Sequence, residues 1–177
     1  QYAIQVAKDN GCLISFDPNL RLSLWKTPEE ARRRILYGMK QCDIMKISEE
    51  EVAFVSEQES LEKGVSFIRD NSDIKILFVT LGNKGSIAYY KDEKIYCGGI
   101  HQEHVVDTTG AGDTFCGAVL SRILELGTDD LTEKDIREML LFANAAASIV
   151  VTRKGALCSM PEPEEIRAAS SLIDKVL

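Results

Sequence analysis

Short apolar runs alternate along the chain with longer segments whose apolar residues recur every three to four positions. The first short run is bounded by Asn10-Gly11 and by Asp17-Pro18-Asn19, and apolar runs framed by such turn residues are typical of buried strands. Strands that alternate with helices predict an α/β layered domain with a largely parallel sheet. We expect strands at Cys12–Phe16, Cys42–Met45, Lys75–Thr80, Ser86–Tyr90 (as a hairpin partner of the preceding run), Lys94–Cys97 and His104–Val106.

Capping residues mark where the helices begin. Thr27 is a suitable N-cap, Pro28 fits the first helical position, and Glu30 completes a capping-box pattern. Gly127 ends the first of two long helical segments. We expect helices from Thr27 onward and at Ser48–Ser56, Leu61–Arg69, Ala111–Leu126, Thr132–Val150 and Glu162–Lys175, with the end of a further helix at Tyr2–Ala7.

The composition is that of a globular protein, with 45% hydrophobic and 28% charged residues among 177. This length predicts a single α/β domain over residues 1–177. The formal net charge of −7 argues against a nucleic-acid partner, which would require a basic face. No apolar run is long enough to cross a bilayer, and no signal-peptide pattern is present, so we expect no membrane partner.

Five cysteines are scattered without a C-x-x-C pair. An odd, dispersed set indicates reduced thiols in a cytoplasmic protein. The chain opens at Gln1 in what already looks like the end of a helix. We therefore expect a fragment, the C-terminal part of a longer polypeptide.

The stretch from Val105 to Phe115 carries the clearest chemistry. A β-branched lead-in is followed by glycines at 110 and 112 and then by a helix, so several backbone N–H groups and the positive end of a helix dipole face one way. Asp113 stands where a carboxylate could accept a proton from an attacking hydroxyl group. The plainer interpretation is that Asp113 caps the helix and the glycines turn the chain. The stretch is not a Walker A loop, because no G-K-[ST] follows.

Five motifs in order make this sequence similar to the ribokinase-like (PfkB-type) family of carbohydrate kinases. They are D-T-T-G-A-G-D-T-F at 107–115, F-D-P-N-L-R at 16–21, K-I-S-E-E-E at 46–51, V-T-L-G-N-K-G-S at 79–86 and V-T-R-K-G-A at 151–156. The resemblance covers Phe16 to Ser159. It implies a three-layer α/β/α fold with a largely parallel central sheet, whose N-terminal part and lid lie outside these residues.

The same resemblance implies an ATP-dependent sugar kinase that uses Mg²⁺. Asp113 would be the general base that deprotonates a primary hydroxyl of the sugar, and Gly110, Ala111 and Gly112 would form the anion hole. A monovalent cation, usually K⁺, would stiffen this loop. Its implied ligands, mostly backbone carbonyls on one side, are Asp107, Thr109, Val150, Arg153, Gly155 and Ser159. A solvated turn is the alternative for Arg153–Gly155.

Other positions are assigned to the nucleotide, the phosphates and the metal by the resemblance. The implied nucleotide contacts are Lys46, Thr80, Gly82, Gly85 and Asn144, the last beside the adenine, and the implied sugar and phosphate contacts are Asp17, Asn19, Arg21 and Asp113. Glu51 would hold Mg²⁺ through water. Ser48 replaces the usual Asn of the metal motif, and Ser48–Glu51 equally forms a capping box. An ordinary hairpin turn, a turn-forming Asp-Pro-Asn and simple helix packing remain alternatives for the other positions.

The scaffold around F-D-P-N-L-R, with L-W-K and E-E-A-R after it, resembles the fructokinase branch. Fructose is therefore the expected substrate. The alternative substrates are ribose, 2-keto-3-deoxygluconate, a nucleoside and a sugar phosphate. The alternative to a kinase is a catalytically incompetent binding module. The sequence leaves open whether the full-length protein is a homodimer. His101 and His104 are expected at the surface and not at a metal, because an extended segment points them to opposite faces.

Overall fold

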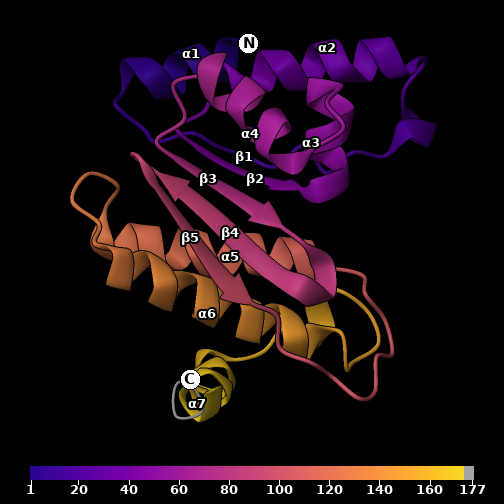
Figure 1. The fold of residues 1–177 in the computed structure, drawn as a ribbon, viewed down its shortest axis with the longest axis vertical. Helices are drawn as coiled ribbons and strands as arrows, with labels where there is room; N and C mark the ends of the chain where they lie inside the picture. Colours follow the sequence, from indigo (N-terminus) through magenta and orange to yellow (C-terminus); the bar gives the residue numbers. More distant parts are fainter. Residues whose placement is uncertain (174–177) are drawn as a thin grey trace. The chain divides into compact units, whose positions relative to one another are not determined.

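Three parallel strands form the sheet of the first half of the computed structural model, which describes residues 1–173 (Figure 1). Strand β1 (Ser15–Phe16) pairs with β2 (Ile44–Ser48), and β2 pairs with β3 (Ile76–Thr80). The register places Ser15 opposite Ile44 and Ser48 opposite Thr80. The first four residues of β2 and of β3 are buried without alternation, as expected for parallel strands covered on both faces.

The helices of this half supply much of its core. They are α1 (Tyr2–Asp9), α2 (Pro28–Met39), α3 (Glu49–Ser56) and α4 (Leu61–Asp70), with a 3-10 turn at Leu22–Leu24. Each of the last three helices turns an apolar stripe inward, and α3 packs on α4. Their buried apolar residues are Ala31, Ile35, Met39, Val52, Val55, Val65 and Ile68.

A β-hairpin and two long helices dominate the second half. Strands β4 (Gly85–Tyr90) and β5 (Glu93–Gly98) are joined by two residues, which requires them to run antiparallel. Helix α5 (Ala111–Leu126) packs on α6 (Glu133–Val150), and α6 contacts both β5 and α7 (Pro163–Ile173). Two further 3-10 turns lie at Gly82–Lys84 and Leu157–Ser159.

The strands are ordered β1-β2-β3-β4-β5, which confirms the predicted α/β class. The residues group into two compact units, the first being Gln1–Thr80 with Tyr89–Asp92 and the second Leu81–Ala88 with the chain from Glu93 onward. A single domain over 1–177 stays a prediction. None of the helices among the described residues is long and apolar enough to span a bilayer.

Most predicted elements are present, with shifted ends. Strand β1 begins at Ser15 and not at Cys12, and β2 continues to Ser48 because Lys46 is buried in the strand and paired there. The Thr27 hydroxyl accepts the Glu30 N–H, as predicted. Helix α7 ends at Ile173 in the described part, so Lys175, the predicted end, lies outside it.

The strand expected at His104–Val106 is wrong. The segment forms no ladder in the described part of the chain, and the side chains of Val105 and Val106 are exposed. The N–H of Val106 donates instead to the carbonyl of Val151 at 2.8 Å. β-Branched residues favour strands only where a neighbouring strand and a packed face receive them.

Candidate active site

A polar cluster lies where β1 and β2 of the first unit end, and we define it as Asp17, Asn19, Lys46, Ser48 and Glu51. The Lys46 ammonium (Nζ) lies 3.2 Å from Oδ2 of Asp17, and Lys46 is 8% exposed. Parallel sheets bind ligands beyond the carboxyl ends of their strands, so the cluster occupies the expected edge.

Burial raises the pKa of the Asp17 carboxyl, because it removes water from the charged form. The charge and hydrogen bond of Lys46 and the N–H of Asn19 act in the opposite direction but do not cancel the effect. Asn19 adopts a left-handed conformation with φ of 42° while its N–H donates to Oδ1 of Asp17 at 3.0 Å. The turn is thus organised by the carboxylate that we assigned to the phosphates.

Glu51 joins the start of α3 to the turn after β1. Its Oε2 accepts the N–H of Ser48 at 2.9 Å, and the Ser48 hydroxyl accepts the N–H of Glu51 at 3.2 Å, a full capping box. Its Oε1 accepts the N–H of Leu20 at 2.6 Å. Each carboxylate oxygen keeps a second lone pair, so these bonds do not exhaust the capacity of Glu51 to accept a hydrogen bond from metal-bound water.

Two other predicted site residues of the first unit, Thr80 and Arg21, lie outside the polar cluster as defined, and they differ in where they lie relative to it. Thr80 ends β3 in register with Ser48, so it lies at the same edge of the sheet as the cluster. The guanidinium of Arg21 is exposed and donates to the carbonyl of Leu20 at 3.1 Å. Arg21 therefore adjoins the cluster along the chain, and within the described part of the structure it forms no ion pair with it.

In the second unit, the glycine loop, residues 107–113, leads into α5. Gly110 is the N-cap with a φ of 83°, and the N–H of Thr114 donates to its carbonyl at 2.8 Å. The N–H groups of Gly112 and Asp113 belong to the first turn, where helix geometry provides no intrahelical acceptor. Asp113 is exposed in that turn. A carboxylate and the helix amides thus share one turn.

Asp107 ties the glycine loop to the 155 loop, residues 151–159. Its Oδ1 accepts the N–H of Thr109 at 2.9 Å and its Oδ2 accepts the N–H of Gly155 at 3.2 Å. The hydrogen bonds from the Thr109 side chain, the Thr109 N–H and the Gly155 N–H lower the pKa of the Asp107 carboxyl. A Cβ at Gly110 would lie 3.2 Å from Cα of Ala156, so the two loops also touch through backbone.

Several of the oxygens assigned to a monovalent cation already accept protein hydrogen bonds. The Val150 carbonyl accepts the N–H of Arg153 at 3.0 Å, and the Gly155 carbonyl accepts the hydroxyl of Ser159. Arg153 also pairs with Glu165, which raises the pKa of the guanidinium. A carbonyl oxygen has two lone pairs, so these bonds are compatible with a cation and do not require one.

Gly82 begins the 3-10 turn that leads into β4, and Gly85 is the first residue of that strand; their φ values are 61° and 107°. The side chain of Asn144, on α6, is 7% exposed and bonds to Ser86 and to the carbonyls of Cys97 and Gly98. Sequence reasoning gave no role to Ser86, the last residue of the motif at 79–86, and did not connect Gly98 and Gly99 with this region. The Gly98-Gly99 pair was the available signal, because consecutive glycines often mark a close backbone approach.

A carbohydrate-kinase family model, described as the pfkB family carbohydrate kinase, matches residues 1–163. The chain belongs to the pfkB family. Fructokinase-1 of Oryza sativa subsp. japonica is 42% identical over 166 residues, which are 93% of this chain and 50% of that protein. The chain spans about half the length of the curated relatives that it matches first.

Two solved structures extend the comparison. A double-mutant fructokinase of Vibrio cholerae O395, with fructose, ADP and a potassium ion bound, matches with a TM-score of 0.85 and 33% identity over 94% of this chain and 53% of that chain. The aminoimidazole riboside kinase of Salmonella enterica, with aminoimidazole riboside and an ATP analogue, matches with a TM-score of 0.84 and 26% identity over 96% and 56%. The predicted ribokinase-like, three-layer α/β/α fold is confirmed.

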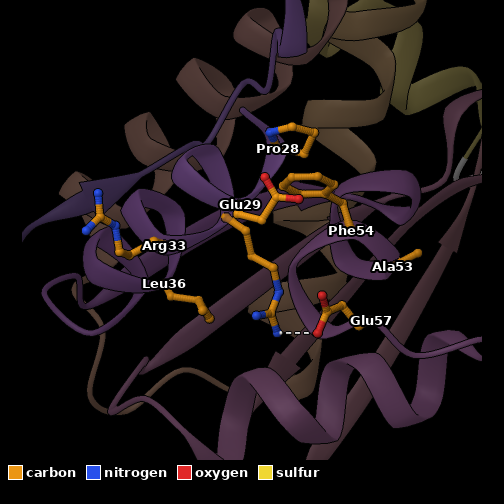
Figure 2. Close-up of a pocket in the computed structure, with 8 residues that line it drawn as sticks. Pro28, Glu29, Arg33, Leu36, Ala53, Phe54 and Glu57 are labelled. Atoms are coloured by element: carbon orange, nitrogen blue, oxygen red, sulfur yellow. Dashed lines mark ion pairs between the residues drawn. The ribbon is translucent and has the colours of Figure 1, made fainter. Parts of the chain in front are cut away.

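A pocket of about 540 Å³ lies between α2 and α3, apart from every residue assigned to the pfkB chemistry (Figure 2). The guanidinium of Arg32, one of the wall residues, lies 3.1 Å from a carboxylate oxygen of Glu57 and donates to the carbonyl of Val55 at 2.8 Å. The wall residues are Pro28, Glu29, Arg32, Arg33, Leu36, Ala53, Phe54 and Glu57. No group of three or more His, Cys, Asp or Glu side chains suited to a metal occurs among the described residues, and His101 and His104 are exposed as predicted.

Proposed function

We propose that the protein carrying this chain is an ATP-dependent kinase that phosphorylates a primary hydroxyl of a sugar, with fructose as the preferred substrate. The observation that carries the proposal is the first turn of α5, where the Asp113 carboxylate and backbone amides without intrahelical acceptors occur together. Similarity to fructokinases over nearly the whole chain supports the sugar.

Asp113 acts as general base in this mechanism. Its carboxylate takes the proton of the sugar hydroxyl as that oxygen attacks the γ-phosphorus of ATP. A new P–O bond forms, the bond from the γ-phosphorus to the oxygen bridging to the β-phosphate breaks, and ADP leaves with that oxygen. The predicted anion hole of Gly110, Ala111 and Gly112, together with the N–H of Asp113 and the positive end of α5, stabilises the transferring phosphoryl charge.

The polar cluster suits the phosphates and their metal. Mg²⁺ favours oxygen ligands and keeps several waters, and the donor set of Asp17 and Glu51 fits such an ion. When bound, Mg²⁺ would neutralise phosphate charge. Lys46, paired with Asp17, would present its ammonium to a phosphate, and Arg21 has an exposed guanidinium suited to the same task.

The remaining assignments follow the same proposal. Thr80, Gly82 and Gly85 would line the ATP phosphates and ribose. A K⁺ ion would be held by the glycine loop and the 155 loop, and its effect would be to stiffen the anion hole that Asp107 already orients.

The test is sugar-dependent ADP release by the complete protein, with fructose, ribose, glucose, 2-keto-3-deoxygluconate and a nucleoside. Asp113→Asn should lower kcat about 10²–10⁴-fold while ATP binding persists. Glu125→Gln removes an exposed carboxylate from the same helix and should leave kcat unchanged. Equal activity of Asp113→Asn and wild type would exclude the assigned base.

A second substrate class has one specific observation in its favour. The Salmonella structure that resembles this chain is a riboside kinase, so a nucleoside-selective signal would keep the mechanism and replace the sugar. ATP binding without turnover of any acceptor would favour the binding-module alternative.

A further inference from the structure

The oxygen and both N–H hydrogens of the Asn144 side-chain amide bond to protein groups of the second unit. Its Oδ1 accepts the hydroxyl of Ser86 at 3.0 Å, and its Nδ2 donates to the carbonyls of Cys97 and Gly98, each at 3.2 Å. A backbone carbonyl can only accept a hydrogen bond, so the side of the amide that faces Cys97 and Gly98 must be its NH₂ group. Both hydrogens of that NH₂ group are therefore engaged. Ser86 is 0% exposed and Asn144 is 7% exposed, so water cannot readily replace these partners.

The backbone that Asn144 holds lies directly against the turn at residues 82–85. A Cβ at Gly85 would lie 2.2 Å from the carbonyl oxygen of Cys97, and a Cβ at Gly99 would lie 2.2 Å from the carbonyl oxygen of Asn83. Side chains at either position would therefore collide with backbone. The two segments approach so closely that the position of one determines the position of the other.

Hydrogen bonds connect the same two segments. The carbonyl of Lys84 accepts the N–H of Gly99 at 3.1 Å and the phenol hydroxyl of Tyr96 at 2.7 Å. Gly82, Asn83 and Lys84 are nonetheless exposed. The turn is thus open to solvent on its outside, and its backbone is fixed from inside through residues 96–99.

We propose that Ser86 and Asn144 are positioning residues for the nucleotide, acting through the Cys97–Gly98 backbone on the turn at 82–85. The proposal rests on the proposed function for the assignment of that turn to the ATP phosphates. It differs from a direct adenine contact by Asn144, because both amide hydrogens would first have to leave the carbonyls that they bind. Because the turn is already ordered before ATP binds, the free energy of binding is not reduced by the entropic cost of ordering it.

The decisive variant is Ser86→Ala, which removes the donor to Asn144 and adds no bulk. Its matched control is Ser148→Ala, which removes another buried hydroxyl, bonded at 2.8 Å to Ala145, one turn along α6. Asn144→Asp removes both donors but also introduces a buried charge, so it serves as a secondary variant. All are made in the complete protein.

Ser86→Ala should raise KM for ATP about 5-fold, the factor that corresponds to one neutral hydrogen bond, while kcat at saturating ATP stays near wild type. Ser148→Ala should leave KM for ATP unchanged. Hydrogen exchange gives a second readout: the amide of Gly99 should exchange faster in Ser86→Ala and not in Ser148→Ala. An equal loss of thermal stability in both variants with unchanged KM would overturn the positioning role.

The two readouts separate this proposal from the function on which it rests. If wild type releases ADP with a sugar and Ser86→Ala behaves like the control in both measurements, the positioning role fails and the kinase stands. If wild type transfers phosphate to no acceptor, the proposed function fails. The hydrogen-exchange rate of the Gly99 amide in Ser86→Ala then still tests whether Ser86 and Asn144 fix the position of the turn.

Discussion

The Asp107 carboxylate accepts the backbone N–H of Gly155 at 3.2 Å, across 48 residues of sequence. The same carboxylate also accepts the N–H of Thr109 at 2.9 Å. One side-chain charge therefore orients the loop before α5 and fastens it to the loop after α6. The geometry of the candidate anion hole depends on that charge.

The lowered pKa of Asp107 predicts how stability responds to acid. A depressed folded-state pKa contributes stability that is complete above the unfolded pKa of about 3.9. This contribution is lost as the pH falls through the lower, folded value. Asp107→Asn should therefore melt below wild type at pH ~6, and the difference in Tm should narrow as the pH falls below ~4. A constant difference over the whole pH range would contradict this role.

Glu51→Gln should destabilise the protein whatever its role toward a metal. The carboxylate accepts N–H groups from Leu20 and Ser48 inside a buried site, and a glutamine amide would present a donor to one of them. We expect a loss of about 2 kcal/mol in the free energy of unfolding, measured with urea. Glu50→Gln, one residue earlier and exposed, should change it by less than about 0.5 kcal/mol.

Lys46→Met should raise the pKa of Asp17 further, because the charge and hydrogen bond of Lys46 oppose the effect of burial. The measurement is a ¹³C NMR titration of the Asp17 carboxyl. Because the folded-state pKa lies above the unfolded one, protonation of Asp17 favours the folded state. This contribution to stability is complete below the unfolded pKa of about 3.9 and is lost as the pH rises through the folded pKa. Adding Asp17→Asn should abolish this pH dependence, and an unshifted carboxyl titration would refute the pairing.

Gly85 and Gly98 form a matched pair for testing the turn at 82–85. Gly85→Ala would place Cβ 2.2 Å from the Cys97 carbonyl at a φ of 107°, which should cost about 3 kcal/mol or more. Gly98→Ala meets nothing closer than the Tyr96 hydroxyl at 3.7 Å, and should cost about 1 kcal/mol or less. Thermal unfolding of the two variants checks both values, and equal costs would show that the segments are farther apart.

The long helices were predictable because their ends carry chemical signals. Ala111–Leu126 has the predicted bounds, with a glycine in positive φ at each end. The helix predicted at Thr132–Val150 is present as Glu133–Val150, with Thr132 as its N-cap. The strand at His104–Val106 was wrong because its valines have strand propensity but no neighbouring strand to pair with in the described structure. Local pattern does not reveal whether such a neighbour exists.

The candidate site was predictable only where a motif spans it. The resemblance assigned Asp107 and Gly155 to one site, and the structure brings them together. It gave Asn144 a contact with the adenine, and the structure shows the Asn144 amide bonded to Ser86, Cys97 and Gly98. Ser86 and Asn144 are 58 residues apart, and no local pattern connects a serine in a strand with an asparagine in a helix.

The capping box of Ser48 and Glu51 has an evolutionary consequence. Because these side chains begin α3 and secure the turn after β1, selection for folding alone would preserve them. A descendant that had lost phosphoryl transfer would keep both residues as long as it had to fold. Their presence in a relative is therefore weak evidence of activity, whereas loss of Asp113, the proposed base, would indicate a relative without the proposed phosphoryl transfer.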